Sequence, residues 1–206
     1  MSSSNNPYFI VTEFEKRVAE WCGTPFGVSV ESCTMALFLC LKYIGGRGFD
    51  VTIPSRTYVG VPCSIIHAGH KVIFEDVEWE GEYQLRPFPI WDAALRFRPN
   101  MYHGGFQCLS FHSKKLLPIG RGSIILTDDE KAVEWLTRAR FDGRRPIPMQ
   151  EDNFDMLGWN CYMTAEQAAR GIDLFEVLRR SGKELDDLKV SEQNYPYLPN
   201  YPVYQQ

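Results

Sequence analysis

Short runs of apolar and β-branched residues alternate with helix-like segments along the first part of this chain. Runs at 26–30, 50–53 and 71–74 have the composition of buried strands, and apolar stretches at 34–43 and 59–67 lie between them, each closed by glycine. An order of strand, helix and strand is typical of units in which a helix crosses between parallel strands. We therefore expect an α/β fold with a mostly parallel central sheet flanked by helices.

The rest of the chain extends this pattern. A capping-box pattern at Thr12–Glu15 predicts a helix start. Further strands are expected at 90–91, 107–111 and 123–126, and further helices at 128–140 and 164–178. The stretch Val77–Pro89 holds charges, Gly81 and two prolines, so it is predicted to be a connection. Residues 1–190 are expected to form one compact domain, and 191–206, with three prolines and four tyrosines, an irregular tail.

Composition argues against several classes of partner. With 206 residues and a formal net charge of −4, the chain lacks the basic surface that nucleic acids need, so no nucleic-acid partner is expected. No apolar stretch is long enough to span a bilayer, so no membrane partner is expected either. The six cysteines form no C-x-x-C pair and no zinc-binding spacing. We therefore predict no metal site and a reducing, cytoplasmic compartment.

Polar residues follow the first two expected strands where those strands end. Ser32, Cys33 and Thr34 open the next helix, and their side chains and free backbone N–H groups could bind a phosphate. An ordinary helix cap is the simpler explanation of these three residues taken alone. Tyr58 comes after the second strand, where its ring could stack on a planar ligand or simply pack against neighbouring residues.

Two later strand ends carry an acid and a lysine. Asp92 follows the apolar pair Ile90-Trp91, and Ser110 and Lys115 follow the next strand. A lysine can form a Schiff base with the aldehyde of pyridoxal 5'-phosphate, and a carboxylate can keep the cofactor's ring nitrogen protonated. Singly, Asp92 could cap a helix and Lys115 could be solvated. Together and in this order, these residues indicate a pyridoxal-phosphate site.

The motifs resemble, in order, those of the DegT/DnrJ/StrS-type sugar aminotransferases, which are pyridoxal-phosphate enzymes with the aspartate aminotransferase fold. Ser32–Leu37 is similar to the family's phosphate-binding motif, and Pro54–Tyr58 to the segment whose aromatic residue lies against the cofactor ring. Asp92–Ala94 is similar to the segment with the acid on the ring nitrogen. Ser110–Lys115 resembles the motif with the phosphate-binding serine and the Schiff-base lysine. The segment 158–169 resembles a stretch whose asparagine reaches the partner subunit's cofactor phosphate.

The resemblance implies a role for each of these positions. Lys115, with adjacent Lys114 as the fallback, would form the Schiff base, and Asp92 would be the second catalytic residue. The implied cofactor-binding residues are Ser32, Cys33, Thr34, Tyr58, Asp92, Ser110, Lys115 and Asn160. The resemblance further implies a homodimer with shared active sites. Its substrates would be an amino donor and a keto sugar carried by a nucleotide.

Several positions depart from the family's pattern. Leu95 stands where Gln or His is usual beside the cofactor, Cys33 replaces a glycine, and Arg121 stands in a glycine-rich region. Only fifteen residues separate Asp76 from Asp92, where the family has further strand and helix units. The resemblance therefore implies a reduced aspartate-aminotransferase-like large domain, with no C-terminal small domain.

These departures leave two alternatives to an aminotransferase. One keeps the cofactor and changes the reaction: a decarboxylase or lyase acting on a modified nucleotide or an amino-acid-like group. The other is a non-catalytic relative that binds a partner or a ligand. The presence of Asp92, Ser110 and Lys115 opposes the second alternative, because a pure scaffold would need none of them.

Overall fold

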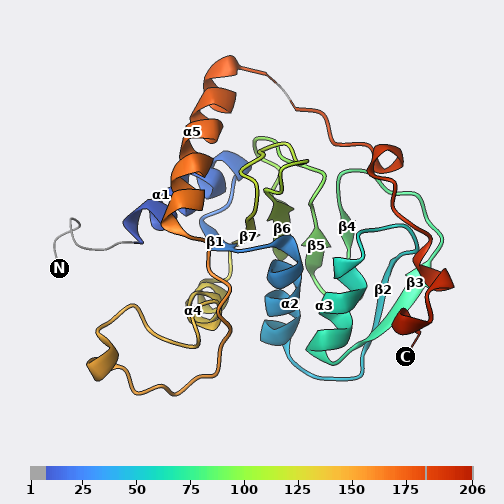
Figure 1. Ribbon diagram of the computed structural model, residues 1–206, viewed down its shortest axis with the longest axis horizontal. Helices are drawn as coiled ribbons and strands as arrows, with labels where there is room; N and C mark the ends of the chain where they lie inside the picture. Colours follow the sequence, from blue (N-terminus) through green and yellow to red (C-terminus); the bar gives the residue numbers. More distant parts are fainter. Residues whose placement is uncertain (1–7, 184, 206) are drawn as a thin grey trace.

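The computed structural model describes residues 8–183 and 185–205, so the N-terminal segment 1–7 lies outside it (Figure 1). The helices are α1 (Phe9–Cys22), α2 (Cys33–Ile44), α3 (Gly60–Ala68), α4 (Glu130–Ala139) and α5 (Ala165–Ser181). The strands are β1 (Phe26–Val30), β2 (Asp50–Pro54), β3 (Lys71–Glu75), β4 (Tyr83–Gln84), β5 (Ile90–Asp92), β6 (Phe106–Ser110) and β7 (Ser123–Thr127). Within the described residues, none of these helices combines the length and the apolar character needed to cross a membrane.

The main sheet has five strands in the order β1-β7-β6-β5-β4, and it is mostly antiparallel. Strand β7 runs antiparallel to β1 and β6, and β4 antiparallel to β5, while β5 and β6 are parallel. The prediction of a mostly parallel sheet is therefore wrong. Parallel neighbours need a long crossover, whereas residues 85–89 and 111–122 return the chain directly from β4 to β5 and from β6 to β7.

The predicted crossover unit does form in β2–α3–β3. Strands β2 and β3 pair in parallel as a separate two-stranded sheet, and α3 connects them. This pair lies beside the main sheet, because Thr52 of β2 exchanges backbone hydrogen bonds with Arg86, just after β4 (N···O 2.8 and 3.2 Å). The stretch Val77–Pro89 is thus not a simple connection: it contains β4 and links the two sheets.

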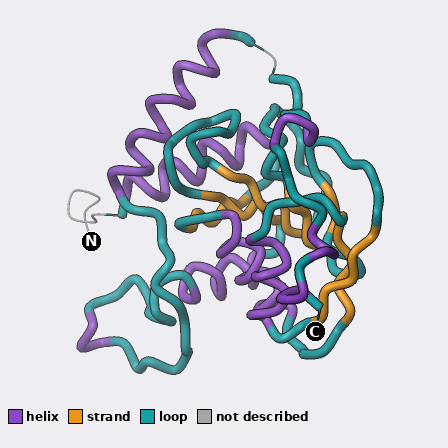
Figure 2. The backbone as a smooth tube through the Cα atoms, turned by 45° about the vertical axis from the view of Figure 1, so that its right-hand side comes forward, coloured by secondary structure: helices purple, strands orange, loops and turns teal. Residues whose placement is uncertain are grey.

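Helices cover both faces of the main sheet, which lies between them in Figures 1 and 2. The side chain of Ile125 packs in a core cluster with residues of α2, α3 and α4. Its neighbours Ile124 and Leu126 point the other way, into a cluster with residues of α1 and α5. Because side chains alternate along a strand and both faces are covered, β7 is buried over its whole length.

One predicted helix start needs correction. Helix α1 begins at Phe9, so Thr12 lies inside the helix and does not cap it. The structure forms a capping box at α5 instead: the Gln167 N–H donates to the Thr164 hydroxyl, and the Thr164 N–H donates to the Gln167 side chain (3.3 and 2.9 Å). Both sequences fit the motif, but Thr164 lies at the start of its helix and Thr12 lies inside its own.

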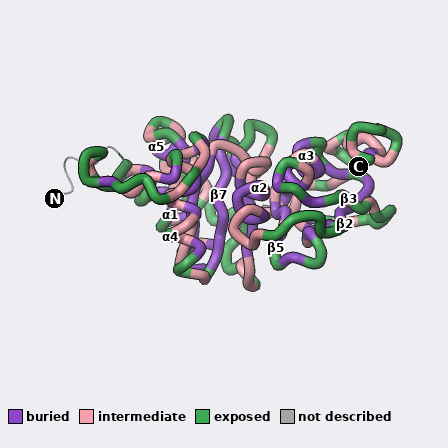
Figure 3. The backbone as a smooth tube through the Cα atoms, turned by 90° about the horizontal axis from the view of Figure 1, so that it is seen from below, coloured by how far each residue is buried: buried purple, intermediate pink, exposed green. Residues whose placement is uncertain are grey.

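The C-terminal tail folds back onto the β2–β3 side of the molecule (Figure 1). It contains the short 3-10 turns η3 (Val190–Gln193), η4 (Leu198–Asn200) and η5 (Pro202–Tyr204). Leu198 is fully buried, and its N–H donates to the Ser55 carbonyl at 2.9 Å. The Arg56 guanidinium lies 5.1 Å from the ring centre of Tyr197. In Figure 3 exposed segments lie towards both ends of the molecule and buried ones at its centre.

Candidate active site

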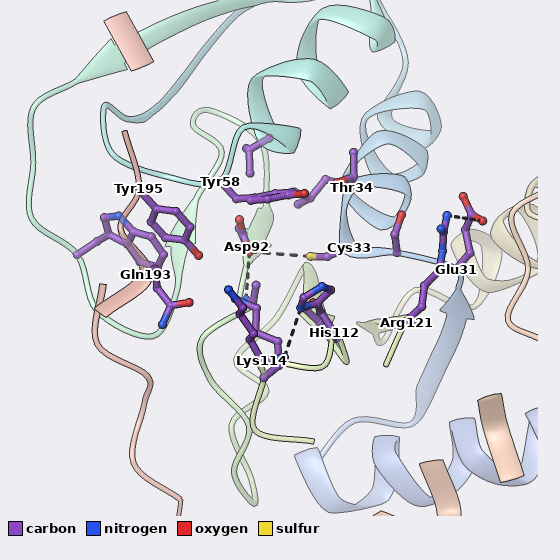
Figure 4. A pocket seen from close by; sticks show the side chains of 18 residues that line it. Glu31, Cys33, Thr34, Tyr58, Asp92, His112, Lys114, Arg121, Gln193 and Tyr195 are labelled. Atoms are coloured by element: carbon purple, nitrogen blue, oxygen red, sulfur yellow. Dashed lines mark hydrogen bonds and ion pairs between the residues drawn. The ribbon is translucent and has the colours of Figure 1, made fainter. Parts of the chain in front are cut away.

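A cavity of about 270 Å³ opens where the start of α2, the ends of β5 and β6, and the tail meet (Figure 4). Seven of the eight predicted cofactor-binding residues line it: Ser32, Cys33, Thr34, Tyr58, Asp92, Ser110 and Lys115. They come from four separate segments of the chain. The fold therefore brings the predicted site residues to one place.

Asp92 lies at the end of β5 and is 3% exposed. The Tyr83 hydroxyl donates to its Oδ2 at 3.0 Å, and the Ala94 N–H donates to its Oδ1 at 3.1 Å. Burial raises the pKa of Asp92, while the Ala94 N–H, the Tyr83 hydroxyl and the charge of Lys115 act against that rise. Both carboxylate oxygens are thus restrained at a buried position in the wall of the cavity.

Lys115 lies in the loop after β6 and is half-buried, whereas Lys114 is exposed. Burial lowers the pKa of Lys115, and the charge of Asp92 opposes that shift. A lower pKa leaves more of the amine neutral, and the neutral amine is the form that attacks a carbonyl. Both lysines line the cavity, but burial favours Lys115 as the nucleophile.

The start of α2 gives the cavity hydroxyl groups and the positive end of a helix. Ser32 caps the helix by accepting a hydrogen bond from the Met35 N–H at 3.3 Å, and Thr34 lies in the first turn. Ser110 lines the same cavity from β6. A helix start with nearby hydroxyls is a ready binding site for a phosphate.

Cys33 points away from the helix start and towards Asp92. Its Sγ lies 4.0 Å from the Asp92 Oδ1 and 3.6 Å from the Cys108 carbonyl oxygen. Burial, and then the charge of Asp92, raise the pKa of Cys33 well above its usual value, so the thiol is neutral. The cysteine that replaces the family's glycine therefore packs against the acid.

Tyr58 lines the cavity from the loop before α3, and its ring lies above the Asp92 side chain in the view of Figure 4. The tyrosine is 56% exposed. Gly60 allows this approach: an added Cβ there would meet the Thr34 hydroxyl and would lie 2.9 Å from the Tyr58 ring. Nothing in the sequence marks Gly60, because the need for a glycine comes from a contact between segments.

Further cavity residues come from segments without a recognisable motif. Trp79 and Tyr195 line the wall opposite α2, and their rings stack almost parallel, with centres 6.3 Å apart. The Tyr195 hydroxyl points towards Asp92 in Figure 4, and burial followed by the charge of Asp92 raises the pKa of Tyr195. No periodicity or motif marked these aromatic residues.

Two positions named from the sequence lie outside this cavity. Asn160 is exposed, and its side chain donates to Asp142 at 2.8 Å. Its expected contact with a partner's cofactor stays a prediction, since the structure holds one chain. Leu95, where a polar residue is usual in the family, is fully buried in the protein. Lastly, Arg121 lies at the rim and pairs with Glu31 at 2.9 Å.

Comparison with known proteins identifies the family. The model of the DegT/DnrJ/EryC1/StrS aminotransferase family matches residues 4–93 and 101–186. The chain belongs to this family. Its members use pyridoxal phosphate. Among curated relatives, the spore coat polysaccharide biosynthesis protein SpsC of Bacillus subtilis is 31% identical over 65% of this chain and 35% of its own length. GDP-perosamine synthase of Caulobacter vibrioides is 25% identical over 81% of this chain and 56% of its own length.

Solved structures agree with the fold. AtS13 from Actinomadura melliaura superposes with a TM-score of 0.73 at 22% identity, over 83% of this chain and 60% of that one. A DegT/DnrJ/EryC1/StrS aminotransferase from Brucella abortus gives a TM-score of 0.69 at 21% identity, over 83% and 59%. The chain thus spans about 60% of these structures and at most 56% of the two curated relatives.

Proposed function

We propose that this chain is a pyridoxal-phosphate-dependent aminotransferase that transfers an amino group to a keto sugar carried by a nucleotide. One observation supports this proposal most: Asp92, Ser110, Lys115 and the start of α2 line a single cavity. This set fits the cofactor, since it combines a restrained buried acid, an amine with a lowered pKa and a phosphate-binding helix start. When bound, pyridoxal phosphate supplies an aldehyde and an electron-withdrawing ring.

Each residue then has a defined task. The Nζ of Lys115 would hold the cofactor through its aldehyde and, once free, would move the proton at the substrate Cα. The Asp92 carboxylate holds the proton on the ring nitrogen. Ser32, Thr34 and Ser110 bind the phosphate together with the N–H groups of α2. Tyr58, which lines the same cavity, would pack against the cofactor ring.

The finer parts of the proposal concern substrate and assembly. The names GDP-perosamine synthase and spore coat polysaccharide biosynthesis protein support a substrate linked to a sugar nucleotide. We propose a cytoplasmic homodimer in which Asn160 reaches the partner's cofactor phosphate. The loop after α4 supports an interface, because it carries the exposed apolar side chains of Met149, Phe154 and Leu157 (54%, 56% and 94% exposed).

The test begins with cofactor loading. Full-length protein mixed with pyridoxal phosphate should gain the visible absorption band of the lysine-bound cofactor. Lys115→Ala should abolish the band, whereas Lys114→Ala, which changes the neighbouring exposed lysine, should retain it. A wild-type protein that never colours would favour a non-catalytic binding protein and overturn the proposal.

The second step distinguishes the reaction. L-Glutamate or L-glutamine added to the coloured protein should convert the bound cofactor to its pyridoxamine form. If the protein colours but no amino donor gives this form, the cofactor assignment stands and transamination is wrong. A decarboxylase or lyase would then be the better assignment.

A further inference from the structure

Tyr83 reaches the candidate site from the segment between Asp76 and Asp92. It lies in β4, which pairs antiparallel with β5 so that Tyr83 is directly opposite Asp92. Residues opposite each other in an antiparallel pair present their side chains on the same face. Accordingly, the Tyr83 hydroxyl lies 3.0 Å from the Asp92 Oδ2, and the tyrosine is 7% exposed.

The direction of the hydrogen bonds at Tyr83 follows from its neighbours. Its hydroxyl is also 2.6 Å from the Oγ1 of Thr57, which is 1% exposed. An ionised carboxylate can only accept, so Tyr83 donates to Asp92, and Thr57 donates to Tyr83. Burial, and then the charge of Asp92, raise the pKa of Tyr83 well above its usual value, so the phenol keeps its proton. The two hydrogen bonds therefore run in one direction, from Thr57 after β2 through Tyr83 to Asp92 at the end of β5.

Few other groups compete for the Asp92 carboxylate. The Cys33 sulfur is 4.0 Å from Oδ1, and a thiol is a weak donor. Lys115 contributes a charge, but no hydrogen bond to Asp92 is found for it among the described residues. Among the described residues, the titratable groups that interact electrostatically with Asp92 are Lys115, Cys33, Tyr83, Cys108 and Tyr195. Tyr83 is the side chain of this set that lies within ordinary hydrogen-bond distance of the carboxylate.

We propose that Tyr83 is the positioning residue for Asp92: its hydroxyl holds the carboxylate ionised and oriented to keep the proton on the cofactor's ring nitrogen. This inference rests on the proposed function for the role of Asp92. Asp92 needs hydrogen-bond donors because it is buried. Burial favours the neutral form of the carboxyl group, and each donor offsets that preference. A neutral or rotated Asp92 could not stabilise a protonated ring nitrogen.

The first experiment needs no cofactor. Carbon NMR of carboxyl-labelled aspartate in the unloaded full chain, with the Asp92 signal assigned by its loss in Asp92→Asn, gives the titration midpoint of Asp92. Tyr83→Phe removes one oxygen and keeps the ring against Trp79, whose ring centre is 4.6 Å away. The midpoint should move to higher pH, by an amount that corresponds to about a tenfold change in the ionisation constant. An unchanged midpoint overturns the proposal.

The matched control is Tyr102→Phe. The Tyr102 hydroxyl donates to Asp128 at 2.9 Å, the same kind of bond, and neither residue lines the cavity. This variant should leave the titration midpoint of Asp92 unchanged. A shift as large as that of Tyr83→Phe would show that the change at Tyr83 acts only through general destabilisation. If Tyr83→Phe does not fold, Thr57→Val serves as the second variant. It removes the donor to Tyr83 and should raise the titration midpoint of Asp92 by a smaller amount. No shift in that variant would then overturn the proposal.

The second experiment uses the loaded protein. Tyr83→Phe should bind pyridoxal phosphate and show the visible band, because Lys115 is unchanged, but the pH dependence of the band should differ from that of wild type. Turnover should fall about tenfold with little change in KM. If wild-type protein does not bind the cofactor, the proposed function fails, and the NMR titration still decides whether Tyr83 controls Asp92. A band that titrates as in wild type would contradict the role of Tyr83.

Discussion

The two walls of the cavity are built in different ways. On one side, Ser32, Thr34, Ser110 and Lys115 lie in compact motifs next to the ends of regular elements. On the other side, Trp79 and Tyr195 line the cavity from a loop and the tail, and Tyr83 bonds Asp92 without lining the cavity itself. Contacts between distant segments fix the positions of these three residues. Variants of the first wall should change ligand binding with little effect on stability. Variants that detach the tail should act by loosening that segment, whereas Tyr83→Phe should act on the ionisation of Asp92.

The largest effect is expected at Asp92, where the two walls meet. Asp92→Asn keeps the size of the side chain and removes the charge that would hold the proton of the ring nitrogen. With cofactor bound through Lys115, turnover should fall about 10²–10³-fold, the range seen when one preorganised electrostatic group is lost. Single-turnover kinetics of the loaded protein would measure this loss. Unchanged turnover would show that Asp92 does not take part in the reaction.

The next effect concerns the tail. Leu198 is fully buried and anchors the tail against Ser55, so Leu198→Ala should cost about 2–5 kcal/mol at that contact. We expect the tail to detach before the main core unfolds, which hydrogen exchange at residues 195–205 would detect. Cofactor should also dissociate faster, because Tyr195 leaves the cavity wall. Tyr201→Ala is the control, since Tyr201 is 47% exposed. If dissociation is unaffected by detachment of the tail, this wall does not retain the cofactor.

A smaller effect is expected at Gly60, on the wall built from motifs. An alanine in a helix normally stabilises it relative to glycine, but the added Cβ here would displace the Thr34 hydroxyl and the Tyr58 ring. Gly60→Ala should therefore weaken pyridoxal-phosphate binding about fivefold, roughly the loss of one hydrogen bond, without lowering the melting temperature of the unloaded protein. Titration of the visible band measures the first quantity. Thr34→Val should reproduce the weaker binding, and a difference between the two variants would assign the effect to Tyr58.

The same contrast explains what the sequence could predict. The motifs of the first wall are contiguous, so the sequence and the family resemblance predicted Ser32 at a helix start and Ser110 and Lys115 at a strand end. In the structure Ser32 caps α2, Ser110 is the last residue of β6, and Lys115 lies in the loop that follows. The stretch Val77–Pro89 was predicted as a connection because its charges resemble those of a solvated loop. In the structure, one of those charges, Glu82, is largely buried in contacts with Arg96, His103 and Gln107.

Strand direction is the other feature that the sequence did not predict. Alternating helices and strands suggested crossovers throughout, but only the β2–α3–β3 unit has a helical crossover between paired strands among the described elements. The short returns before β5 and β7 reverse the chain and make those pairs antiparallel. Tyr83 faces Asp92 because of this reversal, so the missed strand and the missed site residue have one cause.

The smallest predicted effect tests the burial of Asp92 in the unloaded protein. The pKa of Asp92 is raised in the folded state, so the unfolded chain loses this proton first as the pH rises, and stability falls between the unfolded and folded pKa values. Asparagine does not titrate. Asp92→Asn should thus melt above wild type at neutral pH, and the difference should disappear in acid. Thermal unfolding across a pH series measures it.

Asp152 supplies a control of opposite sign. The Arg145 N–H donates to its Oδ2 at 2.8 Å, and this bond is the main cause of the lowered pKa of Asp152. A lowered pKa contributes stability that is present at neutral pH and is lost as the pH falls through the folded value. Asp152→Asn should therefore melt below wild type at neutral pH and approach it in acid. If both variants shift in the same direction, the burial of Asp92 does not control its ionisation, and the need for a donor such as Tyr83 disappears with it.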